Sequence, residues 1–185
     1  GVQGIANAHQ AAANLATTEM FYVVDADAWI LDTFKFEVRR EAIDYTITYV
    51  YNTLNPVNHL VYGYGGIKLF PKSAFSKLPS TYVDMTTSIL PVVRVLPEIS
   101  NITRFDTSAY DAWRSAFREC VKLSSKIIQS QNAEDTEYRL NTWCNIASGP
   151  YGAFVIKGAR AGREFGEAHA SDPVKLSQIN DYSFL

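Results

Sequence analysis

The sequence predicts an α/β chain in which strands dominate the first half and helices the second. A continuous apolar run at residues 20–24 and a β-prone run at 44–51 indicate strands. From residue 107 onward, apolar residues recur at helical spacing, with charged residues on another face. Because 185 residues with 47% hydrophobic content suit one globular unit, we expect a single domain over residues 1–185.

The composition argues against several classes of protein. The 17 Lys and Arg residues nearly balance 19 Asp and Glu, so net charge gives no support for nucleic acid as a partner. No apolar run is long enough for a membrane helix, and no charged segment precedes one at the start. We therefore expect no membrane partner and a cytoplasmic location, in the host cytoplasm if the protein is viral. Cys120 and Cys144 are too sparse for a disulfide framework, and we expect them to be reduced.

The first half reads as a helix followed by several strands. Alanine-rich residues 5–16 predict a helix, and the aromatic and β-branched run at 20–24 suits a central strand that is covered on both faces. The strand at 44–51 is closed by a turn at 52–58. Further strands are expected at 67–70, where Pro71 ends the run, and at 92–95 and 102–105.

The second half reads as four helices. The longest begins near residue 107, with Thr107 or Ser108 in the N-cap position. The others are expected at 134–146, 151–166 and 173–182. Gly158, Gly162 and Gly166 recur every four residues, so they form one ridge that another backbone could approach closely.

Two carboxylates, Asp25 and Asp27, follow the strand at 20–24 directly. Carboxylate pairs at a strand end form a hard-oxygen site suited to Mg or Mn, which can in turn hold a diphosphate. Ligands of open α/β sheets also bind outside the carboxyl ends of strands. The alternative interpretation is that both residues simply cap a turn or the next helix.

The stretch from Gly1 to Phe36, with its Ala-rich helix, apolar strand and D-x-D, resembles the D-x-D region of GT-A glycosyltransferases, in particular glycosyltransferase-like proteins of bacteriophages and marine metagenomes. The resemblance implies a mainly parallel sheet with flanking helices, a Mn or Mg cofactor, a nucleotide-sugar donor and a hydroxyl acceptor. It implies that Asp27 is the main metal ligand and that Asp25 holds the ribose or a metal-bound water. It further implies His169 as a metal ligand, the alternative being a lone surface histidine.

The segment from Tyr62 to Lys68, Tyr-Gly-Tyr-Gly-Gly-Ile-Lys, resembles the glycine-containing acceptor strand of the same superfamily. Glycines let a ligand approach the main chain, and tyrosine rings stack on sugars. A tight hairpin with two surface tyrosines is the alternative. The substrate-binding residues expected here are Tyr62, Tyr64, Gly65, Gly66 and Lys68.

For an enzyme that inverts its sugar, the resemblance also implies a carboxylate base near the acceptor hydroxyl, commonly at the start of a helix that follows the acceptor strand. Asp106 fits that place, although an N-cap role alone would explain it, and Asp111 is the second candidate. Arg114 and Arg118 could neutralise a leaving diphosphate, or could belong to a solvated helix face.

A GT-A fold begins with a strand-helix-strand unit that grips the nucleotide base, whereas this chain starts near the helix before the D-x-D. The resemblance therefore implies that the nucleotide-binding unit is missing and that the domain is N-terminally truncated. Three explanations are open: the chain is a fragment, another chain supplies the missing unit, or the family has lost the donor site. In the last case the chain would be a non-catalytic binding or assembly module, possibly viral, that presents its tyrosines to a partner. We expect the sheet edge beside residues 20–24 to be open or covered by a rearranged segment, and the chain to form a symmetric homodimer.

Overall fold

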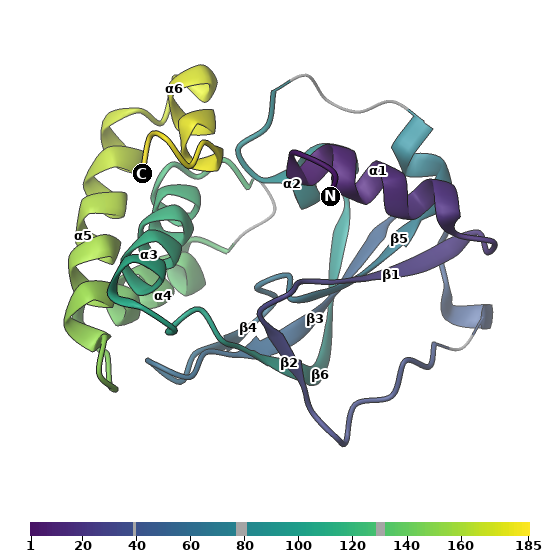
Figure 1. Ribbon diagram of the computed structural model, residues 1–185, viewed down its shortest axis with the longest axis horizontal. Helices are drawn as coiled ribbons and strands as arrows, with labels where there is room; N and C mark the ends of the chain where they lie inside the picture. Colours follow the sequence, from purple (N-terminus) through teal and green to yellow (C-terminus); the bar gives the residue numbers. More distant parts are fainter. Residues whose placement is uncertain (39, 77–80, 129–131) are drawn as a thin grey trace. The chain divides into compact units, whose positions relative to one another are not determined.

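The computed structural model describes residues 1–38, 40–76, 81–128 and 132–185 (Figure 1). Backbone contacts divide the chain into two units. The first lies within residues 1–54, 61–80 and 85–103 and holds the β-sheet, and the second lies within 55–60, 81–84 and 104–185 and holds the long helices. The α/β class and the helical second half are thus confirmed, whereas the expectation of a single domain over residues 1–185 stays a prediction.

The first unit contains one mixed sheet, whose strands follow the order β1-β5-β3-β6-β2, with β4 paired to β3. Among the strands that the described residues form, only β3 and β6 pair in parallel, and the other pairs are antiparallel. The expectation of a mainly parallel sheet is therefore wrong. Parallel neighbours need long, usually helical, crossovers, and most of the described helical residues lie after the sheet in the sequence. The strands are β1 (Met20–Val24), β2 (Ala28–Ile30), β3 (Thr48–Leu54), β4 (Val61–Tyr62), β5 (Ile67–Pro71) and β6 (Val93–Thr103).

The strand β1 lies at an edge of the sheet, so its predicted central position is wrong. Both of its faces are nevertheless covered. Phe21 packs against Phe70 and Phe75 on one face, while Tyr22 packs against Phe36 and Tyr51 on the other. An apolar run indicates that both faces of a strand are covered, but it does not indicate whether other strands pair with both of its edges.

Several strand boundaries differ from the sequence-based expectation. Asp44 accepts hydrogen bonds from the backbone and hydroxyl of Thr46, and this turn delays β3 to Thr48. The strands expected at 92–95 and 102–105 are one continuous strand, β6, with register shifts against β3. The short edge strand β2 was not anticipated.

Short helices complete the first unit. The helix α1 (Ile5–Leu15) matches the expected range and lies against β1 and β5 (Figure 1), where the ring of His9 packs against both Phe70 and Phe75. Residues that follow β2 cover the opposite face, with Phe34 packed against Tyr51. The remaining helices of this unit are η1 (Arg40–Ala42), η2 (Lys72–Ser76) and α2 (Met85–Ile89).

The second unit is built on α3 (Ala109–Ser124), α4 (Ala133–Asn145), α5 (Gly152–Ala168), α6 (Pro173–Ser177) and η3 (Gln178–Asn180). Ser108 caps α3 by accepting a hydrogen bond from the Asp111 amide at 3.0 Å, as one of the two expected N-caps. The last predicted helix is shorter than expected because it breaks into α6 and η3. Among the helices that the described residues form, none combines the length and apolar character needed to cross a membrane.

The predicted glycine ridge is confirmed on α5. A methyl group added at Gly158 or Gly162 would stand closer than 3.0 Å to backbone atoms of α3, and one added at Gly166 would meet Ser124. The missing side chains therefore let α3 and α5 approach each other through their backbones, which helices with larger residues cannot do.

Candidate functional site

The Asp25 turn, residues 25–28, joins β1 to β2 and so links the two edge strands of the sheet. The Asp25 amide donates to the Gly66 carbonyl at 2.9 Å, and the Ala28 amide donates to the Asp25 carbonyl at 3.0 Å, which closes the turn. Asp27 occupies an exposed position inside it. The structure thereby places the D-x-D beside the glycines that precede β5, two motifs that lie far apart in the sequence.

The side chain of Lys68 is bound to this turn. Its Nζ donates to Asp25 Oδ1 at 2.8 Å and also to the carbonyl oxygen of Gly65. The Lys68 side chain is only 4% exposed, whereas that of Asp25 is 37% exposed. Gly65 has a φ of 95°, a left-handed backbone conformation that favours glycine and turns this carbonyl toward Lys68. One negative charge of the D-x-D is thus neutralised within the chain.

Asn101 of β6 completes the site, and sequence reasoning missed it. A methyl group at Gly66 would stand 2.6 Å from Asn101 Nδ2, so the two residues meet directly. Asn101 Oδ1 accepts from Thr53 Oγ1 and Ser100 Oγ, each at 2.8 Å, while Nδ2 donates to Thr103 Oγ1 at 3.3 Å. In the sequence, Asn101 and Thr103 stand on either side of an apolar residue. Polar residues at alternate positions are unusual in a buried strand, and this pattern could have indicated the polar network.

The two tyrosines expected to bind sugar differ in exposure. Tyr62 of β4 is buried, while Tyr64 is half-buried, and their rings meet edge to face with centroids 5.6 Å apart. The Tyr64 amide donates to the Tyr62 carbonyl at 2.8 Å. Only Tyr64 therefore offers much ring surface to a ligand.

The candidate bases lie in the second unit, near the start of α3. Asp106 accepts from Arg104 Nε at 3.0 Å. Asp111 accepts from the hydroxyls of Ser108 at 2.7 Å and Thr107 at 3.1 Å, and these hydrogen bonds lower its pKa. A carboxylate with a lowered pKa is a weak base. The hydrogen bonds of Asp111 are those of a residue that caps the start of α3.

The two arginines expected to bind diphosphate contact the C-terminal segment, and their binding of a diphosphate stays a prediction. The Arg114 guanidinium lies 4.4 Å from the Tyr182 ring centroid, and Arg118 Nη2 donates to Asn180 Oδ1 at 2.9 Å. Asn180 in turn donates to the Tyr82 carbonyl at 2.9 Å. These contacts give both arginines a structural role within the second unit.

His169 follows α5, and its ring packs edge to face on Phe165 with centroids 4.5 Å apart. Across the described parts of the chain, no group of three or more His, Cys, Asp or Glu side chains gathers to hold a metal. His169 belongs to the second unit and the two aspartates, Asp25 and Asp27, to the first, so a metal site shared by all three stays a prediction.

The donor set at the Asp25 turn fits a cation that is shared with a ligand better than one caged by protein. Mg typically uses one or two carboxylates and takes its other ligands from water and phosphate oxygens. Asp27 is exposed at the turn, and Asp25 already shares its charge with Lys68. The residues present would thus hold a divalent cation chiefly when a diphosphate binds with it.

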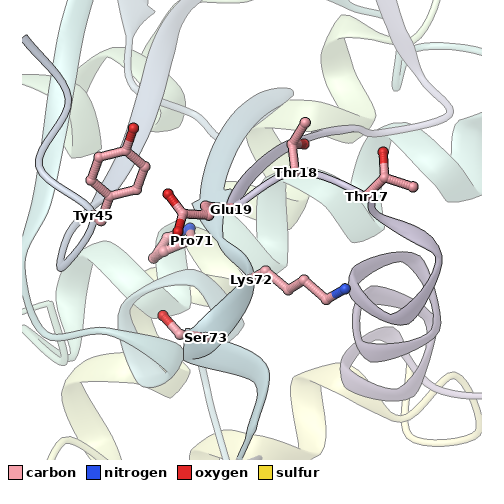
Figure 2. Close-up of a pocket in the computed structure, with 7 residues that line it drawn as sticks. All are labelled: Thr17, Thr18, Glu19, Tyr45, Pro71, Lys72 and Ser73. Atoms are coloured by element: carbon pink, nitrogen blue, oxygen red, sulfur yellow. The ribbon is translucent and has the colours of Figure 1, made fainter. Parts of the chain in front are cut away.

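A cavity of about 650 Å³ lies at the opposite end of the β1–β5 pair (Figure 2). Figure 2 shows Lys72 extending toward the end of α1, where its Nζ donates to the Ala16 carbonyl at 2.7 Å. None of the residues expected from the sequence to bind a ligand lines this cavity. The lining side chains include Thr17, Thr18, Glu19, Tyr45, Lys72 and Ser73.

Comparisons with protein-family models, with curated proteins and with solved structures found no match.

Proposed function

We propose that the chain is a metal-dependent glycosyltransferase, or part of one, that transfers a sugar from a nucleotide-sugar donor to a hydroxyl acceptor. The observation that carries the proposal is the hydrogen bond between Asp25 and Gly66, with Lys68 bound to Asp25. It joins the D-x-D to the glycine-rich strand, the two segments that resemble the donor and acceptor regions of one superfamily.

In this proposal each residue of the turn has a separate task. Asp27 provides the exposed carboxylate for Mn or Mg, which would stabilise the charge of the leaving diphosphate. Lys68 fixes the Asp25 carboxylate and with it the shape of the turn. Gly65 and Gly66 leave the backbone open for a sugar, and Tyr64 offers a ring face. Asp106 stays the predicted base for the acceptor hydroxyl.

Calorimetry with Mn in the presence of UDP-sugars and GDP-sugars tests the proposal. The expected result is binding that requires both metal and nucleotide, because the two carboxylates alone supply too few ligands. Asp27→Asn should abolish this binding with little change in stability. Asp32→Asn, which removes another exposed aspartate near β2, should leave binding unchanged. If Asp27→Asn instead unfolds the protein, the aspartate is a turn-capping residue and the proposal fails.

One observation favours the second candidate, a non-catalytic assembly module. The outer edge of β1 has no strand beside it in the part of the chain that the structure describes. Open edges pair readily with another strand. We propose that this edge pairs with the same edge of a second copy, antiparallel about a two-fold axis, which would make a homodimer. The two candidate functions differ in their requirement for metal, because assembly through β1 requires neither Mn nor nucleotide.

A further inference from the structure

The cavity shown in Figure 2 lies at the end of the β1–β5 pair that is remote from the Asp25 turn. The five residues of β1 separate it from that turn, which at about 3.3 Å per residue corresponds to roughly 17 Å. Its volume of about 650 Å³ lies within the range of roughly 300 to 1,000 Å³ that is usual for small-molecule sites. The proposed sugar transfer gives this cavity no role, so a ligand bound here would occupy a second, separate site.

Tyr45 offers an aromatic ring to this cavity, and its backbone is held in place. Asp44 accepts hydrogen bonds from the Thr46 amide at 2.8 Å and the Thr46 hydroxyl at 2.6 Å, so Tyr45 lies in the middle of a closed turn. The Asp44 amide donates to the Tyr49 hydroxyl at 2.6 Å, which anchors the turn to β3. Tyr45 is nevertheless 42% exposed. A fixed and exposed ring suits stacking, because little conformational freedom is lost when a ligand binds.

The polar groups around this ring are open to a ligand. Within the described residues, no hydrogen bond or ion pair to protein occupies the Glu19 carboxylate or the Tyr45 hydroxyl. The same holds for the hydroxyls of Thr17 and Ser73. Figure 2 shows Tyr45, Glu19 and Ser73 grouped around Pro71, which adds apolar surface. The cavity thus combines a carboxylate and several hydroxyls with an aromatic ring.

The charges of the lining favour a neutral ligand. Glu19 would repel an anion, and the Lys72 ammonium, which donates to the Ala16 carbonyl at 2.7 Å, would repel a cation. Figure 2 shows Lys72 extending toward α1 and away from Tyr45. A neutral sugar meets neither repulsion. Its neighbouring hydroxyls can donate to both oxygens of one carboxylate, and its C–H groups can stack on a tyrosine ring.

We propose that this cavity binds a neutral saccharide, with a sugar ring stacked on Tyr45 and sugar hydroxyls donating to the Glu19 carboxylate. The hydroxyls of Thr17 and Ser73 supply further hydrogen bonds. Binding requires neither metal nor nucleotide, so the site is independent of the proposed transfer function. Apart from Pro71, the lining residues are exposed, and we therefore expect a dissociation constant in the millimolar range.

The test is an NMR titration of the intact, isotope-labelled protein, without Mn or nucleotide, with maltotriose, cellotriose and chitotriose as separate probes. The expected result is that at least one probe shifts the backbone amide signals of residues 17–19, 45 and 72–73. Absence of shifts with all three probes would overturn the proposal. Shifts confined to residues 25–28 and 64–66 would also overturn it, because they would place the sugar at the proposed transfer site and leave the proposed function standing.

Two variants assign the contacts. Tyr45→Ala keeps the hydrogen bonds of its turn and should weaken saccharide binding at least about tenfold through loss of stacking. Glu19→Gln keeps the side-chain shape and should weaken binding about tenfold, because hydrogen bonds to a carboxylate are stronger than those to an amide. The control Tyr138→Ala, at a tyrosine of α4 that is 63% exposed, should leave binding unchanged. If Tyr45→Ala fails to fold, Glu19→Gln decides, and wild-type affinity in that variant would contradict the assignment.

Discussion

At the scale of single residues, the Lys68–Asp25 ion pair decides what each aspartate of the D-x-D can do. Removing the charge of Asp25 leaves the Lys68 ammonium without its counter-ion although its side chain is only 4% exposed. Removing Lys68 leaves a carboxylate that water still reaches, since Asp25 is 37% exposed. An unpaired buried charge costs far more than a partly solvated one.

This asymmetry gives a prediction for stability. Asp25→Asn should lower the free energy of unfolding by about 3 kcal/mol, and Lys68→Met by only about 1 kcal/mol. Urea denaturation of the two variants beside the wild type measures both values. A larger loss for Lys68→Met would show that the ammonium is not the buried partner. Because Asp25 supports the fold in this way, Asp27 is the better residue for testing ligand binding.

His9 makes stability depend on pH. Its Nδ1 donates to the Ile5 carbonyl at 2.8 Å, and its buried Nε2 has no hydrogen-bond partner in the described structure. Burial lowers the pKa of His9 below 6.5, its ordinary value. The unfolded chain therefore binds the proton more tightly, so stability is complete above pH 6.5 and declines as the pH falls toward the folded-state pKa.

The corresponding prediction is a fall in the free energy of unfolding, dependent on His9, as the pH drops below 6.5. His9→Gln should flatten this part of the profile, because glutamine does not titrate. His169→Gln, at the end of α5, serves as the control and should keep the wild-type slope. Parallel profiles for wild type and His9→Gln would rule out His9 as the cause.

At the scale of elements, the packing of α3 against α5 is the most extensive helix–helix contact of the second unit. In a free helix, Gly→Ala stabilises by about 1 kcal/mol. At Gly162 the added methyl would stand closer than 3.0 Å to the Phe117 backbone. Gly162→Ala should therefore destabilise the protein by about 1 to 3 kcal/mol through overpacking.

The matched control for Gly162→Ala is Ala153→Gly, at an exposed position of the same helix. It lies in the first helical turn, where only helix propensity changes, and should cost less than about 1 kcal/mol. Thermal or urea unfolding measures both variants. If Gly162→Ala proves stabilising, the close approach of the two backbones is not as the structure describes.

The edge position of β1 predicts opposite effects of proline at neighbouring residues. The Asp25 amide bonds to Gly66 and the Lys72 amide to the Glu19 carbonyl, so alternate residues, including Val23, direct their amides toward β5. The Val24 amide then points away from the sheet. Val23→Pro should cost about 1 to 3 kcal/mol by removing a ladder hydrogen bond, whereas Val24→Pro should leave the fold intact.

The same pair of variants tests the proposed dimer. Static light scattering over a dilution series should give wild-type masses that rise from the 20.7 kDa of one chain toward twice that value. Val24→Pro should hold the protein at the mass of one chain, because proline cannot donate to a second strand. A wild-type mass of one chain at every concentration would exclude pairing through this edge.

At the scale of the whole molecule, the sequence predicted correctly those features that depend on interactions between residues close together in the chain. The range of α1, the cap at Ser108 and the ridge from Gly158 to Gly166 follow from helix periodicity and capping chemistry, which a few neighbouring residues determine. The D-x-D was also located correctly at the end of its strand.

What the sequence could not predict depends on partners far apart in the chain. The order of the strands in the sheet places β1 at an edge, and nothing within residues 20–24 indicates which strand pairs with β1. The pairing of Asp25 with Lys68 and the contact between Gly66 and Asn101 arise from the same long-range order. Both motifs of the candidate site were therefore visible in the sequence, whereas the lysine and asparagine contacts that join them required the fold.

The central claim, that the Asp25 turn binds a cation together with a diphosphate, is tested most directly by crystallography of the protein grown with Mn and a nucleoside diphosphate. Diffraction data collected at the manganese absorption edge locate the metal independently of the model of the protein. The account predicts an anomalous peak at the Asp27 carboxylate, bridged to the phosphate oxygens, with the Lys68–Asp25 ion pair intact. Nucleotide bound elsewhere, or an anomalous map without a peak at Asp27, would contradict it.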